Sequence, residues 1–324
     1  MQQLNHTVTR DVYKEAALNP QQGLCCTTTP IWQLPGLTIP QRMLEMNYGC
    51  GSTVNPRDLV NSPTILYVGV GGGMEVLQFS YFSRRKGGVI GLDVVDEMLA
   101  ACDENLREAE RRNDWFRRDF VDLRKGDALN LPIAGETVDI AAQNCLFNIF
   151  HDDDLKRALS EMYRVLKPRG KLVLSDPVCD MPMPESVKND ERLRAMCLTG
   201  AIPLAEYVKR LSDLGFGTIE VRAKRPYRLL SPRHFAVDQL IPIESVEIAA
   251  IKDPMPSDGP CVFTGRTAIY YGSDELFDDR KGHTLAQNQP LAVCDKTAKA
   301  LLALGRDDIY VSESTFFYDG GGCC

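Results

Sequence analysis

The feature that most constrains the fold is a regular alternation of strand-forming and helix-forming segments between residues 64 and 222. Such an alternation predicts an α/β protein, in which a parallel sheet is covered by helices on its faces. We expect strands at 64–68, 89–92, 120–124, 138–142, 171–175, 218–222 and 246–250. We expect helices at 74–84, 154–167, 187–197 and 204–214. A further helix is expected after Asp96, with Asp96 as its capping residue.

Proline and glycine breaks divide the chain into three parts. Residues 1–60 form an arm that carries cysteines, and residues 61–254 form the main domain with an insertion at about 177–217. Residues 255–324 form a small appended α+β unit with one clear strand, 267–271, and a Gly-Gly-Gly-Cys-Cys tail.

A glycine-rich turn follows the first predicted strand and opens the first helix of the domain. Gly69, Gly71 and Gly73 belong to this turn, and Asp93 ends the next strand 20 residues after Gly73. Glycine lets a ligand approach the backbone closely, and an acidic residue at this place accepts hydrogen bonds from ribose hydroxyls. The spacing Gly-x-Gly-x-Gly favours S-adenosylmethionine over a nicotinamide cofactor. Asp127, after the third strand, stands where such proteins hold the adenine amino group, although a tight turn alone also explains the glycines.

Eleven cysteines are the second unusual feature of the sequence. Three have distinctive neighbours: Tyr48-Gly49-Cys50-Gly51, Asn144-Cys145-Leu146-Phe147-Asn148 and Met196-Cys197-Leu198-Thr199-Gly200. Cys145 follows a strand, at the edge of the sheet where α/β proteins place functional residues. Thiols that are distant in sequence but able to converge indicate a site for a soft ion.

Charge and hydropathy exclude several classes of function. The net charge of −7 disfavours a general binder of nucleic acid or anionic membranes. The first ten residues are polar, unlike a signal peptide, and no apolar run approaches the roughly 20 residues that span a bilayer. We therefore expect a cytoplasmic monomer whose thiols stay reduced.

The three cysteine motifs resemble the signatures of arsenite S-adenosylmethionine methyltransferases, and residues 61–222 resemble a class I methyltransferase. The Gly-Gly-Gly-Cys-Cys ending is similar to that of the branch associated with arsenosugar synthesis. The resemblance implies a class I methyltransferase Rossmann-like sheet and trivalent arsenic bound by Cys50, Cys145 and Cys197. It also implies a cofactor site formed by Tyr48, Gly69, Gly71, Gly73, Asp93, Met98, Asp127, Ala128 and Asn144.

One residue departs from the pattern of class I methyltransferases. Tyr67 replaces the acidic residue that usually stands two positions before the first glycine of the motif. We therefore expect the amino-acid end of the cofactor to be held differently here.

The chemistry that the resemblance implies is direct transfer of a methyl group to thiolate-bound arsenic(III), giving mono- and dimethylated arsenicals. No general base is required, in agreement with only four histidines, none in a paired motif. Because transfer oxidises arsenic by two electrons, a reductant must return them. We expect the adjacent pair Cys25 and Cys26 to do so through a disulfide with Cys50, which thioredoxin or glutathione then reduces. The tail pair Cys323 and Cys324 is expected to capture arsenite or to carry reducing equivalents.

Simpler explanations stay open for the thiols. Buried cysteine is often a core residue, which is the expectation for Cys102, and Cys261 and Cys294 lie in no motif. Cys179 follows a strand near the predicted crevice and fits either role. A zinc site is disfavoured because no Cys-x-x-Cys pair occurs. Two other functions remain: methylation of a small metabolite with structural thiols, or sequestration of arsenite without turnover.

Overall fold

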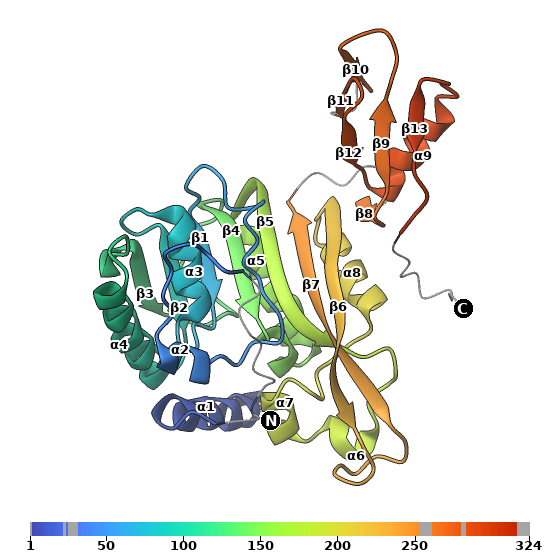
Figure 1. The fold of residues 1–324 in the computed structure, drawn as a ribbon. Coiled ribbons are helices and arrows are strands. Elements are labelled where there is room, and N and C mark those ends of the chain that lie inside the picture. The colour runs from blue at the N-terminus through green and yellow to red at the C-terminus, as the bar shows by residue number, and fades with distance from the viewer. Residues whose placement is uncertain (1, 22–23, 25–31, 253–260, 280–282, 316–324) are drawn as a thin grey trace.

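The computed structural model describes residues 2–21, 24, 32–252, 261–279 and 283–315. A mixed eight-stranded sheet has the order β3-β2-β1-β4-β5-β7-β6-β8 (Figure 1). Its strands are β1 (Ile65–Val68), β2 (Val89–Asp93), β3 (Val121–Lys125), β4 (Val138–Asn144), β5 (Leu166–Val178), β6 (Thr218–Leu230), β7 (Ile241–Ile251) and β8 (Cys261–Phe263). The α/β prediction is confirmed.

The first five strands of the sheet are parallel, and β1 lies between β2 and β4. The chain therefore leaves β1 towards one side of the sheet and later returns to the other side. Where the strand order reverses in this way, the loops at the carboxyl ends of the strands separate and leave a crevice. Strand β7 runs antiparallel to both β5 and β6 and lies between them.

Helices cover both faces of the sheet, as predicted. The α-helices described before residue 252 are α1 (Gln2–Leu18), α2 (Gln41–Glu45), α3 (Met74–Ser83), α4 (Asp96–Arg112), α5 (Asp152–Val165), α6 (Glu185–Lys188), α7 (Glu191–Ala195) and α8 (Leu204–Asp213). Side chains of β1 alternate between the faces. Ile65 and Tyr67 pack in a cluster with α3 and α4, whereas Leu66 and Val68 pack in a cluster with α5 and α8.

Several boundaries differ from those predicted. Helix α4 begins at Asp96 with Val95 as its N-cap, so Asp96 is the first helical residue and not the cap. The single helix predicted at 187–197 is two short helices, because the side chain of Asp190 accepts hydrogen bonds from the backbone N–H groups of Arg192 and Leu193 and starts a new helix.

Strands β6 and β7 are longer than the sequence predicts. Strand β6 continues to Leu230 and pairs with β7 along its length, with register shifts at Val221/Ala223 and Pro226/Arg228. The second shift lets Pro226 occur in the strand although it lacks a backbone N–H group. This long hairpin extends well beyond the rest of the sheet (Figure 1).

The last described segment forms a small unit around its own core, which stands apart from the main sheet (Figure 1). Its elements are β9 (Thr267–Tyr270), β10 (Leu276–Asp278), β11 (Thr284–Ala286), β12 (Pro290–Ala292), α9 (Asp295–Ala303) and β13 (Ile309–Val311). The predicted strand at 267–271 corresponds to β9. A domain boundary near residue 255 stays a prediction, because residues 253–260 lie outside the described part.

Candidate active site

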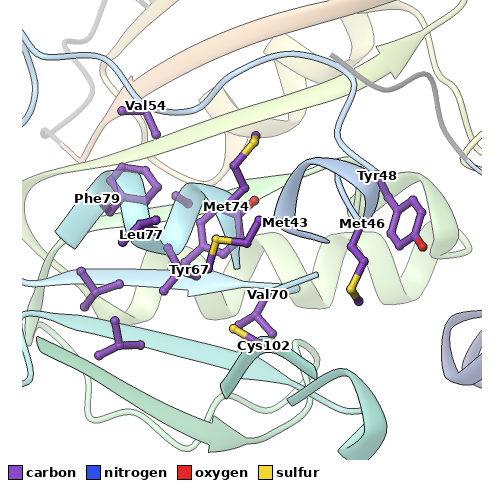
Figure 2. Close-up of a cluster of buried hydrophobic side chains, with 14 of the residues drawn as sticks. Met43, Met46, Tyr48, Val54, Tyr67, Val70, Met74, Leu77, Phe79 and Cys102 are labelled. Carbon is purple, nitrogen blue, oxygen red and sulfur yellow. The ribbon is translucent and has the colours of Figure 1, made fainter. Parts of the chain in front are cut away.

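The glycine turn between β1 and α3 has a backbone that favours glycine. Gly69, Gly71 and Gly73 have φ values of 82°, 51° and 88°, in the left-handed region. A Cβ atom on Gly73 would lie 2.9 Å from Sγ of Cys102, which Figure 2 shows next to Val70. A Cβ atom on Gly71, in contrast, would meet only the carbonyl oxygen of Met46, at 3.7 Å. The turn is therefore packed on one side and open at Gly71.

A pocket lies at the carboxyl ends of β1, β2, β3 and β4, where the strand order predicts a crevice. It is lined by all nine residues that the sequence assigns to the cofactor except Gly73: Tyr48, Gly69, Gly71, Asp93, Met98, Asp127, Ala128 and Asn144. Gly73 lies behind the turn, as the N-cap of α3.

Asp93 forms one end of this pocket together with Asp127. The Asp93 carboxylate accepts hydrogen bonds from the backbone N–H groups of Val70 (3.1 Å) and Val95 (3.0 Å). Burial raises the pKa of Asp93 to about 6, although these hydrogen bonds favour the charged form. Asp93 therefore ties the glycine turn to the loop after β2 and presents a carboxylate to a ligand.

Helix α1 forms a wall of the pocket that the sequence did not predict. Thr9, Arg10 and Tyr13 line the pocket, and the Arg10 guanidinium lies 4.0 Å from the Asp127 carboxylate. Tyr13 donates a hydrogen bond to the carbonyl oxygen of Ala195 in α7 (3.2 Å). Helix α1 thus contacts both Asp127, after β3, and α7, which precedes Cys197.

The loop that carries Cys50 is held against the end of β4. The backbone N–H of Cys50 donates to Oδ1 of Asn144 (3.0 Å), and Nδ2 of Asn144 donates to the carbonyl oxygen of Gly51 (2.9 Å). A Cβ atom on Gly49 would lie 2.6 Å from Nδ2 of Asn144, and one on Gly51 would collide with Oγ of Ser175. The glycines beside Cys50 are therefore needed for this close approach.

Cys145 and Cys197 lie in direct contact, in unusual backbone. Their φ values are 60° and 58°, in a region that few residues other than glycine adopt. The Cys197 thiol donates to the carbonyl oxygen of Cys145 at 2.7 Å. Strained backbone of this kind clusters at functional sites.

The structure brings all three motif cysteines to one region, in one buried cluster. Sγ of Cys50 lies 3.4 Å from Oγ of Ser175, and the backbone N–H of Cys145 donates to the carbonyl oxygen of the same serine (2.7 Å). Sγ of Cys145 also lies 3.9 Å from the hydroxyl of Tyr227, on the long β6–β7 hairpin. Tyr227 is a site residue that the sequence analysis missed, because β6 was predicted to end at residue 222.

A buried carboxylate, Glu75 in the first turn of α3, joins the cofactor pocket to the cysteine loop. It accepts hydrogen bonds from Tyr67 (2.7 Å), Asn144 (3.1 Å) and both the backbone N–H (2.8 Å) and the hydroxyl (3.0 Å) of Thr53. The Tyr67 side chain, which replaces the usual acidic residue, therefore positions another carboxylate in the same pocket.

Comparison with known proteins identifies the family. A family model described as a methyltransferase domain matches residues 66–174. An arsenite methyltransferase of Aquipseudomonas alcaligenes is 32% identical over 298 residues, covering 86% of this chain and 81% of that protein. This chain belongs to the arsenite methyltransferase family.

Other members of the arsenite methyltransferase family match a smaller part of their own length. The arsenite methyltransferase of Halobacterium salinarum is 28% identical over 180 residues, which cover 56% of this chain and 44% of that protein. That of Mus musculus is 33% identical over 172 residues, 52% of this chain and 44% of that protein. The matching part of this chain thus spans less than half the length of these two relatives.

The fold also agrees with that of a solved arsenic(III) S-adenosylmethionine methyltransferase from Chlamydomonas reinhardtii. The TM-score is 0.60 with 21% sequence identity, and the match covers 86% of this chain and 95% of that chain. The predictions of a class I methyltransferase fold and of membership in this family are confirmed.

The remaining cysteines differ from the three of the family motifs. Cys102 is fully buried in α4, where burial raises the pKa of its thiol far above the usual value, in agreement with a core role. Cys179 donates to the carbonyl oxygens of Met181 and Pro242, away from the pocket, and burial raises its pKa. Cys294 is the N-cap of α9. The predicted redox residues Cys25, Cys26, Cys323 and Cys324 lie outside the described part of the chain, as does the side chain of Cys261.

Two negative findings concern the described residues only. They contain no group of three histidine, cysteine, aspartate or glutamate side chains already arranged to hold a metal ion. None of their helices is long and apolar enough to cross a bilayer.

Proposed function

We propose that this protein transfers methyl groups from S-adenosylmethionine to trivalent arsenic bound by the thiols of Cys50, Cys145 and Cys197. The observation that carries the proposal is the Cys197–Cys145 contact, made in strained backbone beside the pocket that Asn144 and Cys145 line. The names of the relatives support arsenite as the substrate.

The pocket residues fit the cofactor. Asp93 would accept hydrogen bonds from the ribose hydroxyls, the open backbone at Gly71 would admit the ligand, and Asp127 and Ala128 would border the adenine. When bound, the cofactor supplies an electrophilic methyl group on a sulfonium, which needs only a nucleophile in line with it. The side chains therefore have no proton to remove, and their task is to orient the two substrates.

The arsenic ligands would come from three separate segments of the chain. Arsenite is a neutral trihydroxide, and each thiol that replaces a hydroxyl gives its proton to that hydroxyl, which leaves as water, so binding involves no net uptake or release of protons. Asn144 holds the Cys50 loop, and Ser175 contacts the thiol of Cys50 and the backbone N–H of Cys145, which keeps these two segments together before arsenic arrives. The Cys197 thiol, which now donates to the Cys145 carbonyl, would have to turn away from it to bind arsenic.

The finer parts of the proposal concern products and reductant. We include mono- and dimethylated arsenicals as products and a thiol reductant, glutathione or thioredoxin, that returns two electrons after each transfer. Cys25 and Cys26 would form the disulfide with Cys50, Cys323 and Cys324 would assist capture or reduction, and the protein would act as a monomer in arsenic detoxification or in making arsenosugar precursors. The sequence motifs support these parts.

The direct test is arsenic speciation after incubation with arsenite, S-adenosylmethionine and glutathione. We expect Cys145→Ser and Cys197→Ser to abolish all methylation. A Cys50→Ser variant should still methylate substrates that already carry a methyl group, because these have fewer exchangeable positions and need fewer sulfur ligands. Cys179→Ser, which removes a buried thiol outside the pocket, is the matched control and should retain turnover.

The alternatives predict different results. A protein that only sequesters arsenite would bind it without using S-adenosylmethionine. A methyltransferase for another small molecule would bind S-adenosylmethionine but release no methylated arsenic. Wild-type turnover in the Cys145→Ser and Cys197→Ser variants would contradict arsenic ligation by these thiols.

A further inference from the structure

Glu75 is a carboxylate inside the pocket with no cationic partner among the described residues. Glu75 is only 4% exposed, yet it lines the pocket. The four hydrogen bonds that it accepts come from uncharged groups of Thr53, Tyr67 and Asn144. A buried charge without a countercharge is costly, so a cation that enters the pocket would be stabilised strongly.

The position of Glu75 within the pocket indicates which part of the cofactor it faces. Asp93 and Asp127 mark the nucleoside end, whereas Glu75 contacts Asn144, the neighbour of Cys145, at the thiol end. If the proposed function is right, the methyl group must reach arsenic at the thiols. The sulfonium that carries this methyl group, and the amino-acid group attached to the same sulfur, must then both lie at the Glu75 end.

We propose that Glu75 gives this protein its preference for S-adenosylmethionine, which carries a positive charge on sulfur, over the product S-adenosylhomocysteine, which does not. Both ligands have the same nucleoside and the same amino-acid group, and they differ by the methyl group and by the positive charge on sulfur. A carboxylate at this end therefore attracts the substrate form more strongly than the product form, which assists release of the product. The inference rests on the proposed function.

Tyr67 has a defined part in this arrangement. Its hydroxyl donates to Oε2 of Glu75 at 2.7 Å, and a hydrogen bond to the charged form of a carboxylate favours that form. Burial acts in the opposite direction and raises the pKa of Glu75, and the hydrogen bonds from Tyr67, Thr53 and Asn144 oppose this rise. The exchange of the usual acidic residue for tyrosine thus leaves one carboxyl group in the pocket, on α3 instead of β1.

The same carboxylate also holds the cysteine loop, which makes the choice of variant important. Both groups of Thr53 that bind Glu75 belong to the segment after Cys50. A Glu75→Gln variant removes the charge and keeps the side-chain shape, whereas Glu75→Asp keeps the charge and shortens the side chain. Loss of loop contacts alone would weaken the binding of both ligands similarly and leave the ratio of their dissociation constants unchanged.

The experiment measures dissociation constants for both ligands by calorimetry at pH 8, without arsenic. We expect the ratio of the Kd for S-adenosylhomocysteine to the Kd for S-adenosylmethionine to fall about tenfold in Glu75→Gln, as expected for loss of one charge interaction in a partly buried site. Glu75→Asp should keep the wild-type ratio. Glu161→Gln is the matched control, since Glu161 accepts from Arg164 and from the backbone N–H of Leu131 outside the pocket.

The wild-type protein supplies a second measurement in case Glu75→Gln does not fold. A cofactor analogue with an ammonium group in place of the sulfonium should bind more tightly than S-adenosylhomocysteine. Equal or weaker binding of this analogue, or an unchanged ratio in Glu75→Gln, would overturn the role of Glu75 while leaving the proposed function intact. Failure of the wild-type protein to bind S-adenosylmethionine would overturn both.

Discussion

The thiol of Cys197 donates a hydrogen bond to the backbone carbonyl oxygen of Cys145 at 2.7 Å, which joins segments 52 residues apart. The contact places a residue from the segment after α7 against the carboxyl end of β4. It depends on backbone shape, because both cysteines have positive φ values. The fold therefore holds both side chains in place although the local backbone conformation is unfavourable.

The first prediction concerns this backbone strain. Left-handed backbone costs a residue with a Cβ atom roughly 1 kcal/mol or more, and glycine avoids the cost. We expect Cys145→Gly and Cys197→Gly to be more stable than the corresponding alanine variants by about 1 kcal/mol in the free energy of unfolding, measured by urea denaturation. Cys102 in helix α4 is the control with the opposite sign, because alanine is favoured over glycine within a helix by about 1 kcal/mol.

The second prediction concerns the glycines beside Cys50. In Gly49→Ala the new Cβ atom would lie 2.6 Å from Nδ2 of Asn144, so the loop or the asparagine must move. We expect about 1–3 kcal/mol of destabilisation and at least about a tenfold loss of arsenite affinity. Gly135→Ala, whose new atom would come no nearer than 3.4 Å to another residue, is the control. Normal arsenite affinity in Gly49→Ala would show that this close approach does not matter.

The third prediction concerns the pH dependence of cofactor binding. Burial raises the pKa of Asp93 to about 6, and the ionised form is the better acceptor for ribose hydroxyls. Affinity for S-adenosylmethionine should therefore fall as the pH drops through about 6. The Asp93→Asn variant should bind the cofactor more weakly, and its affinity should not change with pH in this range. A raised pKa in the folded protein has the opposite consequence for stability. The contribution of Asp93 to stability without cofactor is greatest at acid pH and is lost as the pH rises through about 6.

The sequence predicts the part of the site that is built from adjacent residues. These parts are the first strand, the glycine turn and Asp93. Each is predictable because local chemistry determines it: a buried apolar strand, a left-handed turn and an acidic residue at the end of the next strand. The distinctive neighbours of the three cysteines indicate a soft-ion site, but their assignment as a set of arsenic ligands comes from the family resemblance, since the residues between them carry no spacing rule. The structure supplies the contacts through Asn144 and Ser175 that join them.

The parts that sequence analysis missed depend on tertiary contacts. Helix α1 is polar, so nothing in its composition indicates that Arg10 and Tyr13 line the pocket. Tyr227 reaches the site only because two register shifts allow β6 to continue past Pro226. Glu75 follows the turn motif in a helix, where an acidic residue in the first turn is common and carries no functional signal by itself.

The fourth prediction concerns a buried ion pair that anchors the arm to the sheet. Asp58, whose side chain is 2% exposed, binds Arg222 of β6 and lies 2.7 Å from Lys171 of β5. Burial alone would raise the pKa of Asp58, but the hydrogen bonds and charges of Arg222 and Lys171 hold it below the usual value. We expect Asp58→Asn to lose about 3 kcal/mol of stability at neutral pH, since the two cations lose their countercharge.

The sign of the Asp58 effect can be checked with acid. Because the pKa is lowered on folding, the stabilisation is present above the ordinary carboxyl pKa and is lost as the pH falls through the lower, folded value. The difference between wild type and Asp58→Asn should therefore shrink in acid. Asp213→Asn, which breaks an exposed pair with Lys209, should change stability little at any pH. A constant difference across the pH range would contradict the role of charge.

The last prediction concerns Tyr227, whose hydroxyl lies 3.9 Å from Sγ of Cys145. Its ring packs against two buried clusters, one with the three motif cysteines and one with Cys179 and Ile243, so Tyr227→Phe should preserve the packing and the unfolding temperature. The hydroxyl is close enough to support the thiolate, which is the form that reacts with soft electrophiles. We expect the variant to bind arsenite about three to ten times more slowly, the usual effect of losing one hydrogen bond of about 1 kcal/mol.

Stopped-flow fluorescence measures this rate, and Tyr81→Phe, which loses a hydroxyl contact to Pro35 outside the pocket, is the control. Equal rates in wild type and Tyr227→Phe would show that the hairpin contributes only packing, whereas slower binding with unchanged stability would make it part of the arsenic site.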